Sequence, residues 1–232
     1  MDSELLPIGE TAKLLRVSID TLRRWDKSGR LESLRESPAG HRYYWRQEIE
    51  AQEWVVRGSK ISEAYYCSNS AVFQARLMTL QTKLEKVEDK NLREISPLIV
   101  AVAGEIGNNS FDHNLGNWPD VAGVFFGYNL SKRRIVLADR GQGVLKTLKQ
   151  TLPELKNDDE ALRVAFTKVI SGRAPESRGN GLKFVREVMI KYPLRLTFRT
   201  GEAGLELKPG DKDLVIKKVK PAFRGCLAVI KF

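Results

Sequence analysis

Six acidic, amide or imidazole side chains lie within ten residues that directly follow an apolar run. The stretch EIGNNSFDHN, residues 105–114, comes after LIVAVAG and carries Glu105, Asn108, Asn109, Asp112, His113 and Asn114. On an α-helix, one narrow face would consist of Glu105, Asn108, Asn109 and Asp112, and the opposite face of Ile99, Ala103, Ile106, Ser110 and Phe111. A solvated face is more commonly rich in Lys and Glu. The asparagine-rich face therefore indicates ligation of a hydrated cation or of phosphate.

Two glycine-containing turns are positioned to complete such a site. The run RRIVLADRGQGV, residues 133–144, predicts a strand that ends at Asp139, followed by a turn with Gly141 and Gly143. The later run SRGNGLKFVREVMIKY, residues 177–192, predicts a glycine-rich turn that opens a helix, where amides and the helix dipole can hold phosphate. The basic residues beside this turn are Arg173 and Arg178. Either glycine pair alone is equally consistent with a simple tight turn.

In this order, the three segments resemble the GHKL superfamily of ATP-binding domains. Histidine kinases, anti-sigma-factor serine kinases, type II topoisomerases, mismatch-repair proteins and a heat-shock chaperone share this domain. The resemblance covers about residues 93–232. The matching motifs are Glu105-x-x-x-Asn109-x-x-x-His113 (the N box), Asp139-x-Gly141-x-Gly143 (the G1 box) and Gly179-x-Gly181-Leu182 (the G2 box). The spacing of the N box is closest to that of the anti-sigma-factor serine kinases.

The resemblance implies ATP and Mg²⁺ as cofactors and a role for each motif. Asn109 would ligate the metal ion, and Glu105 would act as the catalytic base toward the attacking water or hydroxyl. Asp139 would accept a hydrogen bond from the adenine amino group, and the G1 glycines would leave room for the ring. Residues 144–178 would form a lid over the nucleotide. The implied cofactor-binding residues are Asn108, Asn109, Asp112, His113, Asp139, Gly141, Gly143, Val144, Arg173, Arg178, Gly179, Asn180, Gly181 and Leu182.

The N-terminal segment predicts a different kind of site. In residues 8–31, apolar positions recur at helical spacing on both sides of Val17-Ser18, which predicts helix, short turn, helix, with Ser18 as the cap of the second helix. Gly29 ends that helix. The stretch GHRYY, residues 40–44, predicts a short wing that leads into a third helix.

This pattern resembles the winged helix-turn-helix of the MerR and excisionase-like families over about the first quarter of the chain. The resemblance implies binding to double-stranded DNA, with the second helix in the major groove and the wing against the phosphates. The implied DNA-binding residues are Ser18, Thr21, Arg23, Arg24, Lys27, His41, Arg42 and Tyr43. The alternative is a small protein-interaction module with a solvated basic face.

Between these regions, residues 59–92 carry a short heptad pattern. The apolar positions step by four and three residues among charged ones, and they are Phe73, Leu77, Leu80, Leu84 and Val87. This pattern favours a helical linker that dimerises as a coiled coil. The alternative is a single helix packed on its own domain. Ser96 and Pro97 then predict the start of the helix that carries the N box.

The predicted fold class is α+β with three regions. Residues 1–58 form the winged helix-turn-helix, residues 59–92 the linker, and residues 93–232 a two-layer α/β sandwich. In that sandwich we expect a mixed, mostly antiparallel sheet with helices on one face. No apolar run approaches the roughly 20 residues of a bilayer span, so no membrane association is expected. The two isolated cysteines lack metal or redox spacing and favour a cytoplasmic protein.

Charge is unevenly distributed along the chain. Residues 1–58 are balanced, whereas residues 93–232 hold 24 Lys and Arg against 15 Asp and Glu, which supplies nearly all of the net charge of +10. A basic surface of this kind suits DNA, a nucleotide or an acidic protein.

These features favour an ATP-responsive DNA-binding regulator that acts as a homodimer. Two alternatives remain open: an anti-sigma-type serine/threonine kinase with a protein substrate, recruited by the helix-turn-helix, and an ATPase subunit of a DNA-processing or defence system. Autophosphorylation on histidine is disfavoured, because the chain contains two histidines, His41 in the wing and His113 in the N box, and neither lies on a helix ahead of the catalytic region. Since no second domain supplies a catalytic lysine, we expect slow hydrolysis or nucleotide sensing.

Overall fold

The N-terminal residues fold into two short helices joined by a tight turn, as their apolar pattern predicts. The computed structural model describes residues 4–35, 37–38, 40–168 and 181–232. Helix α1 (Ile8–Leu15) ends at Arg16, which has a left-handed φ of 52°. Helix α2 (Ile19–Lys27) follows Ser18, whose hydroxyl accepts a hydrogen bond from the amide of Thr21 at 3.1 Å. The cap satisfies an amide that has no partner within the helix.

A small sheet and a third helix complete this N-terminal unit. Strand β1 (Leu5–Pro7) pairs antiparallel with β2 (Tyr43–Trp45), and Leu34 forms a bridge with Tyr43. This is the predicted wing, and it leads into α3 (Arg46–Arg57). The core of the unit consists of Leu6, Ala12, Leu15, Leu22, Trp25, Leu31, Tyr44 and Ile49. The apolar side of α2 therefore faces inward and leaves its basic side outward.

The larger unit is built on a sheet that runs in the order β3–β4–β5–β7–β6. The strands are β3 (Tyr66–Cys67), β4 (Val124–Asn129), β5 (Arg134–Asp139), β6 (Arg195–Leu207) and β7 (Ile216–Lys231). Each neighbouring pair among these described strands is antiparallel, so the prediction of a mixed sheet is wrong. Short connections join β4 to β5 and β6 to β7, and such connections allow only antiparallel pairing.

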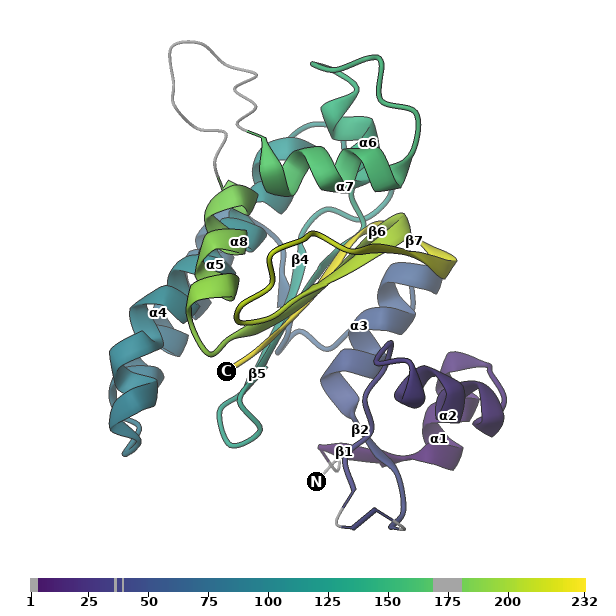
Figure 1. Cartoon of the computed structure of the whole chain (residues 1–232), viewed down its shortest axis with the longest axis vertical. Coiled ribbons are helices and arrows are strands. Elements are labelled where there is room, and N and C mark those ends of the chain that lie inside the picture. The colour runs from purple at the N-terminus through teal and green to yellow at the C-terminus, as the bar shows by residue number, and fades with distance from the viewer. Residues whose placement is uncertain (1–3, 36, 39, 169–180) are drawn as a thin grey trace.

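Helices cover both faces of this sheet, whereas the sequence predicted helices on one face. One face packs against α4 (Ser70–Glu85), α5 (Lys90–Asn114), α7 (Asp158–Thr167) and α8 (Gly181–Lys191). The opposite face packs against α3 of the N-terminal unit (Figure 1), where Trp54 and Val55 share an apolar cluster with Val136 and Leu227. Strand β5 is buried at every position, as expected for a strand covered on both sides. The apolar side chains of residues 135–138 suit a strand that is buried on both sides.

The segment predicted as a dimerising linker belongs to the larger unit. Strand β3 pairs with β4, and α4 packs against α5. The heptad side chains Phe73, Leu80 and Leu84 are fully buried within this one chain. They therefore present no seam to a second chain, and the alternative of one helix packed on its own domain is the arrangement found. The homodimer stays a prediction, and the heptad pattern no longer supports it.

Helix α5 starts earlier than the sequence predicted. Asp89 is its cap and accepts a hydrogen bond from the amide of Leu92 at 3.1 Å. Pro97, expected in the first turn, lies inside the helix and cannot donate to the carbonyl of Arg93. The hydroxyl of Ser96 donates to that carbonyl instead, at 2.8 Å. The Ser-Pro pair is therefore tolerated within one long helix. No helix in the described part of the chain has the length and apolar character to cross a bilayer.

Candidate functional site

A cavity of about 80 Å³ lies where α5, the end of β5 and α6 (Gly143–Leu148) meet. It has room for several water molecules, since one needs roughly 10–15 Å³. Six of the predicted cofactor-binding residues line it: Asn109, His113, Asp139, Gly143, Val144 and Leu182. Much of the remaining lining is apolar and includes Leu137 and Phe198. A mostly apolar cavity with a few convergent polar groups is typical of a small-molecule site.

Asp139 is the buried acidic group of this cavity. Its side chain accepts hydrogen bonds from the Ser110 hydroxyl and from the Gly141 amide, both at 2.8 Å, and only 2% of the residue is exposed. Burial raises the pKa of Asp139, against the lowering effect of its donors, which include groups of Cys226. A titratable group perturbed by desolvation inside a cavity is characteristic of functional sites.

Gly141 is needed because a side chain at this position would collide with Asn114, not because the residue borders an open space for a ligand. A Cβ at this position would lie 2.2 Å from Nδ2 of Asn114. The Asn114 side chain donates to the carbonyl of Ser110 and accepts from the amide of Gln142, both at 2.7 Å. Of the two glycines predicted to leave room for a ring, Gly143 lines the cavity and Gly141 does not.

The predicted catalytic base lies beside the cavity, next to the start of α8. A Cβ at Gly181 would lie 2.5 Å from Oε2 of Glu105 and 3.3 Å from Nδ2 of Asn109. The first turn of α8 therefore approaches the N box closely, as the combination of motifs predicts. Glu105 itself does not line the cavity.

Two predicted cofactor-binding residues point elsewhere. Asn108 accepts a hydrogen bond from Gln74 of α4 at 2.6 Å, and Asp112 is exposed to solvent. Neither lines the cavity, because the polar face of α5 is wider than the cavity mouth and its outer edge faces α4 and solvent. The predictions at Arg173, Arg178, Gly179 and Asn180, and residues 169–178 of the predicted lid, lie outside the described residues. The remaining part of the predicted lid, residues 144–168, contains α6 and α7, and α7 packs on the core through Leu162 and Phe166.

Sequence reasoning missed three polar residues that hold the site together. Ser110, assigned to the packing face, donates to Asp139, and Asn114 bridges α5 to the G1 turn. Thr200 of β6 accepts from the amide of Val144 at 3.2 Å and donates to the carbonyl of Gly225 at 2.9 Å. A polar residue on an otherwise buried face usually has a specific partner. That rule was the available signal for Ser110.

Arg140 connects the cavity to the N-terminal unit. It follows Asp139 directly, and its guanidinium donates to the carbonyls of Trp54 and Val55 near the C-terminal end of α3, at 2.5 and 2.8 Å. The same guanidinium binds Asp120 and thereby holds the pKa of that carboxyl below its usual range. Cations near the end of a helix satisfy its last carbonyls and its dipole. The turn at residues 139–140 thus carries a carboxylate that lines the cavity and a guanidinium that binds the C-terminal end of α3. We call this guanidinium contact the Arg140 clamp.

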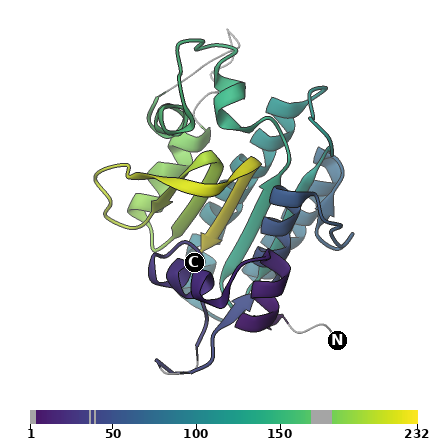
Figure 2. The ribbon, with the colours of Figure 1, turned by 90° about the vertical axis from the view of Figure 1, so that its right-hand side faces the viewer.

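Further polar contacts fix the N-terminal unit against the sheet. The guanidinium of Arg199, from β6, donates to the carbonyl of Arg30, just after α2. Arg134 of β5 pairs with Glu48 of α3 at 3.2 Å, and Lys231 of β7 binds Glu32. Figure 2 shows that the C-terminal end of β7 lies beside the N-terminal unit. The two units are therefore joined by apolar packing and by charge.

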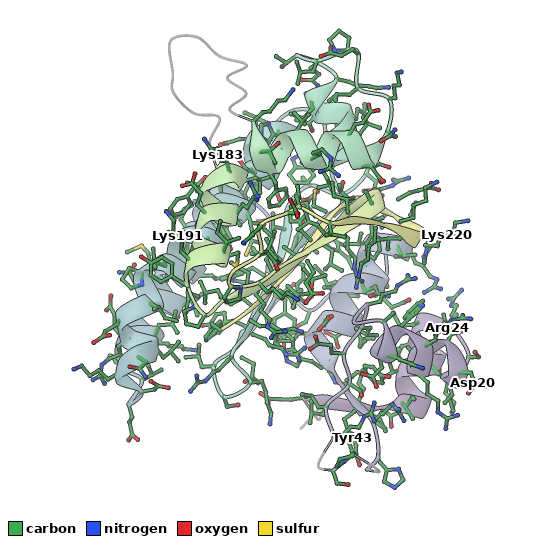
Figure 3. All side chains as sticks on the ribbon, viewed as in Figure 1. Asp20, Arg24, Tyr43, Lys183, Lys191 and Lys220 are labelled. Atoms are coloured by element: carbon green, nitrogen blue, oxygen red, sulfur yellow. The ribbon has the colours of Figure 1, made fainter. Side chains whose placement is uncertain are left out.

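The outward face of α2 carries the predicted DNA-contacting side chains. Arg24 and Lys27 are exposed, and Arg23 is exposed and paired with Asp20 at 2.9 Å. Figure 3 shows Asp20 and Arg24 at the outer edge of the molecule. Thr21 is half-buried, and its hydroxyl lies 2.9 Å from the hydroxyl of Ser18. Ser18 itself is the helix cap, so its hydroxyl has a structural role in addition to the predicted contact.

The wing residues differ in how available they are. His41 is exposed and Tyr43 is half-buried in the small sheet. Arg42 donates to Asp26 at 3.0 Å, and Asp26 also binds Arg35. The pKa of Asp26 is lowered because the hydrogen bonds it accepts, among them those of these arginines, outweigh the opposing effect of its partial burial. The guanidinium of Arg42 therefore supports the wing through Asp26.

Comparison with known proteins identifies the N-terminal unit. Residues 7–44 match the family described as MerR family regulatory protein. The matched range contains α1, α2 and most of the wing, so the chain carries a MerR-like helix-turn-helix, a DNA-binding domain. No similar curated protein was found for the chain.

Proposed function

We propose that this chain is a DNA-binding regulator whose larger unit binds ATP with Mg²⁺ and thereby changes the affinity of the MerR-like domain for DNA. The observation that carries this proposal is the turn at Asp139-Arg140. Its first residue lines the cavity, and its second holds the C-terminal end of α3. Occupancy of the cavity and the position of the DNA-binding unit are thus linked through adjacent residues.

The cavity residues fit an adenine nucleotide. A buried carboxylate at Asp139 suits the exocyclic amino group of a base, and the apolar lining suits its ring. The side-chain oxygen of Asn109 would be a ligand for Mg²⁺, since this ion takes oxygen ligands and phosphates together. The bound metal ion would neutralise phosphate charge. If ATP is turned over, we assign the role of proton acceptor to Glu105, whose carboxylate lies close to Gly181.

The route of the response runs through α3 and not through a coiled coil. Helix α3 contributes Ile49 to the core of the DNA-binding unit and Trp54 and Val55 to the cluster on the sheet. A ligand that draws the turn at residues 139–141 toward the cavity changes the position of the Arg140 clamp. Because α3 is shared by both units, such a change alters how α2 is presented to DNA. Coupling between two sites typically changes affinity by about 5- to 150-fold.

The test measures nucleotide binding and DNA binding separately. Calorimetric titration of the full chain with ATP, with and without Mg²⁺, reports the first, and a gel shift with duplex DNA reports the second. Asp139→Asn is expected to weaken ATP binding by roughly 10- to 100-fold, because a hydrogen bond to a charged group contributes about 1.5–3 kcal/mol. Basal DNA binding is expected to persist. Asp213→Asn, at an exposed position, is the matched control.

Two results contradict the proposal. The first is an absence of ATP binding to the wild-type chain. The second is identical DNA affinity with and without saturating ATP and Mg²⁺, which would leave two independent binding units.

A further inference from the structure

A basic corner of the larger unit lies on the same side of the molecule as the helix that faces DNA. The corner consists of Lys217 and Lys220, both exposed, in the run KKVK at the start of β7. Lys218, between them, pairs with Ala203 and faces the other side of the sheet. Neither lysine of the corner forms an ion pair with another residue in the described ranges. Figure 3 shows Lys220 and Arg24 projecting from the same side, with Lys183 and Lys191 on the opposite side.

The strand register places Lys217 on the face of the hairpin that meets the N-terminal unit. Lys217 lies directly opposite Gly204 of β6, and residues opposite each other in a sheet point to the same face. A Cβ at Gly204 would lie 2.8 Å from Val219, which is buried in the cluster that contains Trp54 of α3. Ala203 and Leu205, on either side of Gly204, face the opposite core. Lys217 is therefore on the α3 side.

The same hairpin contacts the end of α2. A Cβ at Gly29, just past α2, would lie 4.0 Å from Oε2 of Glu206 on β6, and Arg199 of β6 donates to the carbonyl of Arg30. Glu206 is an acidic side chain on this face and partly offsets the charge of the lysines. The contacts fix the basic corner at a constant position relative to Arg24 and Lys27.

We infer that the basic corner binds the phosphate backbone of the same duplex that α2 contacts, so that the DNA-binding surface extends from the MerR-like domain onto the larger unit. The inference rests on the proposed function. Lysines act at phosphates as point charges that need no fixed geometry, which suits an exposed, unpaired cluster. Phosphate contacts set the register and salt dependence of binding and carry no base specificity.

The experiment measures the salt dependence of binding to duplex DNA of mixed sequence. Each phosphate contact contributes about 0.9 to the slope of log affinity against log salt concentration. The double substitution Lys217→Ala with Lys220→Ala is expected to lower the slope by roughly 1.8, which shrinks the loss of affinity between 50 and 200 mM salt by about tenfold. Lys191→Ala, an exposed lysine on α8, is the control and is expected to leave the slope unchanged.

The outcomes separate this inference from the proposed function. Failure of the wild-type chain to bind duplex DNA at low salt contradicts both. If the wild-type chain binds DNA and the double variant has the same salt dependence, the basic corner does not contact phosphate. The helix-turn-helix then remains the DNA-binding unit. A drop in the slope of Lys191→Ala of about half the size expected for the double variant also overturns the inference, because the slope would then follow the number of positive charges removed and not their position. Thermal unfolding of each variant verifies that it is folded.

Discussion

Replacement of Arg140 by alanine tests whether the turn beside the cavity holds the two units together. Arg140 is 7% exposed and is the donor to two α3 carbonyls and to Asp120. Its loss leaves the carbonyl of Val55 without this donor, while the carbonyl of Trp54 still accepts from the amide of Gly58 at 2.8 Å. An unsatisfied buried group costs about 1–3 kcal/mol, and breaking a buried ion pair costs about 3–5 kcal/mol.

The expected loss in the free energy of unfolding is about 3 kcal/mol, because Arg224 still pairs with Asp120 at 2.8 Å after the substitution. For a chain of this length, that corresponds to a fall in melting temperature of roughly 6–12 °C. Arg224→Ala is the control: it contacts the same carboxylate but is half exposed, so it should cost no more than about 1 kcal/mol.

Urea denaturation, analysed with one common m value, measures the free energy of unfolding of both variants. The pKa of Asp120 is lowered in the folded state, first by its hydrogen bond from Arg140, so its contribution to stability is present at neutral pH. It is lost as the pH falls from the unfolded pKa of about 3.9 through the folded value. The gap between wild type and Arg140→Ala should therefore narrow in that acid range. Equal losses for Arg140→Ala and Arg224→Ala would refute the clamp.

Two other substitutions test the packing of α4 and the burial of Asp139. Gly107→Ala should destabilise the chain by about 1–3 kcal/mol, because its Cβ would lie 2.1 Å from the ring of Phe73, whereas Gly104→Ala, at 3.2 Å from Leu77, should change the unfolding midpoint little. An undiminished midpoint for Gly107→Ala would contradict the packing of α4 on α5. Asp139→Asn should raise the stability of the chain without nucleotide at neutral pH. Burial raises the folded pKa of Asp139, so the stability it contributes is full below the unfolded pKa and is lost as pH rises through the folded value. Melting temperatures from pH 4 to 8 should show a smaller decline in the variant than in wild type, and parallel curves would count against this reading.

The sequence by itself determined the local elements and the polar groups of the site. Spacing of apolar residues and the cap at Ser18 specify α1 and α2, since both act within a few residues. The strand that ends at Asp139 and the helix with Asn109 and His113 follow from the same kind of local pattern. Those three residues meet in one cavity, as the motifs predicted.

The tertiary structure alone decided which partner each apolar face takes. A heptad pattern specifies that Phe73 and Leu80 must be buried, but burial against a second chain and burial against α5 satisfy it equally. The same holds for α3, whose two apolar sides gave no indication that one of them covers the sheet. The contact of Arg140 with α3 could not be recognised from its neighbours in sequence, because the two carbonyls it binds lie about 85 residues away. The hydrophobic effect that brings these segments together is non-directional, so it leaves no local signal at Arg140. Contacts of that kind are set by the packing of complete elements.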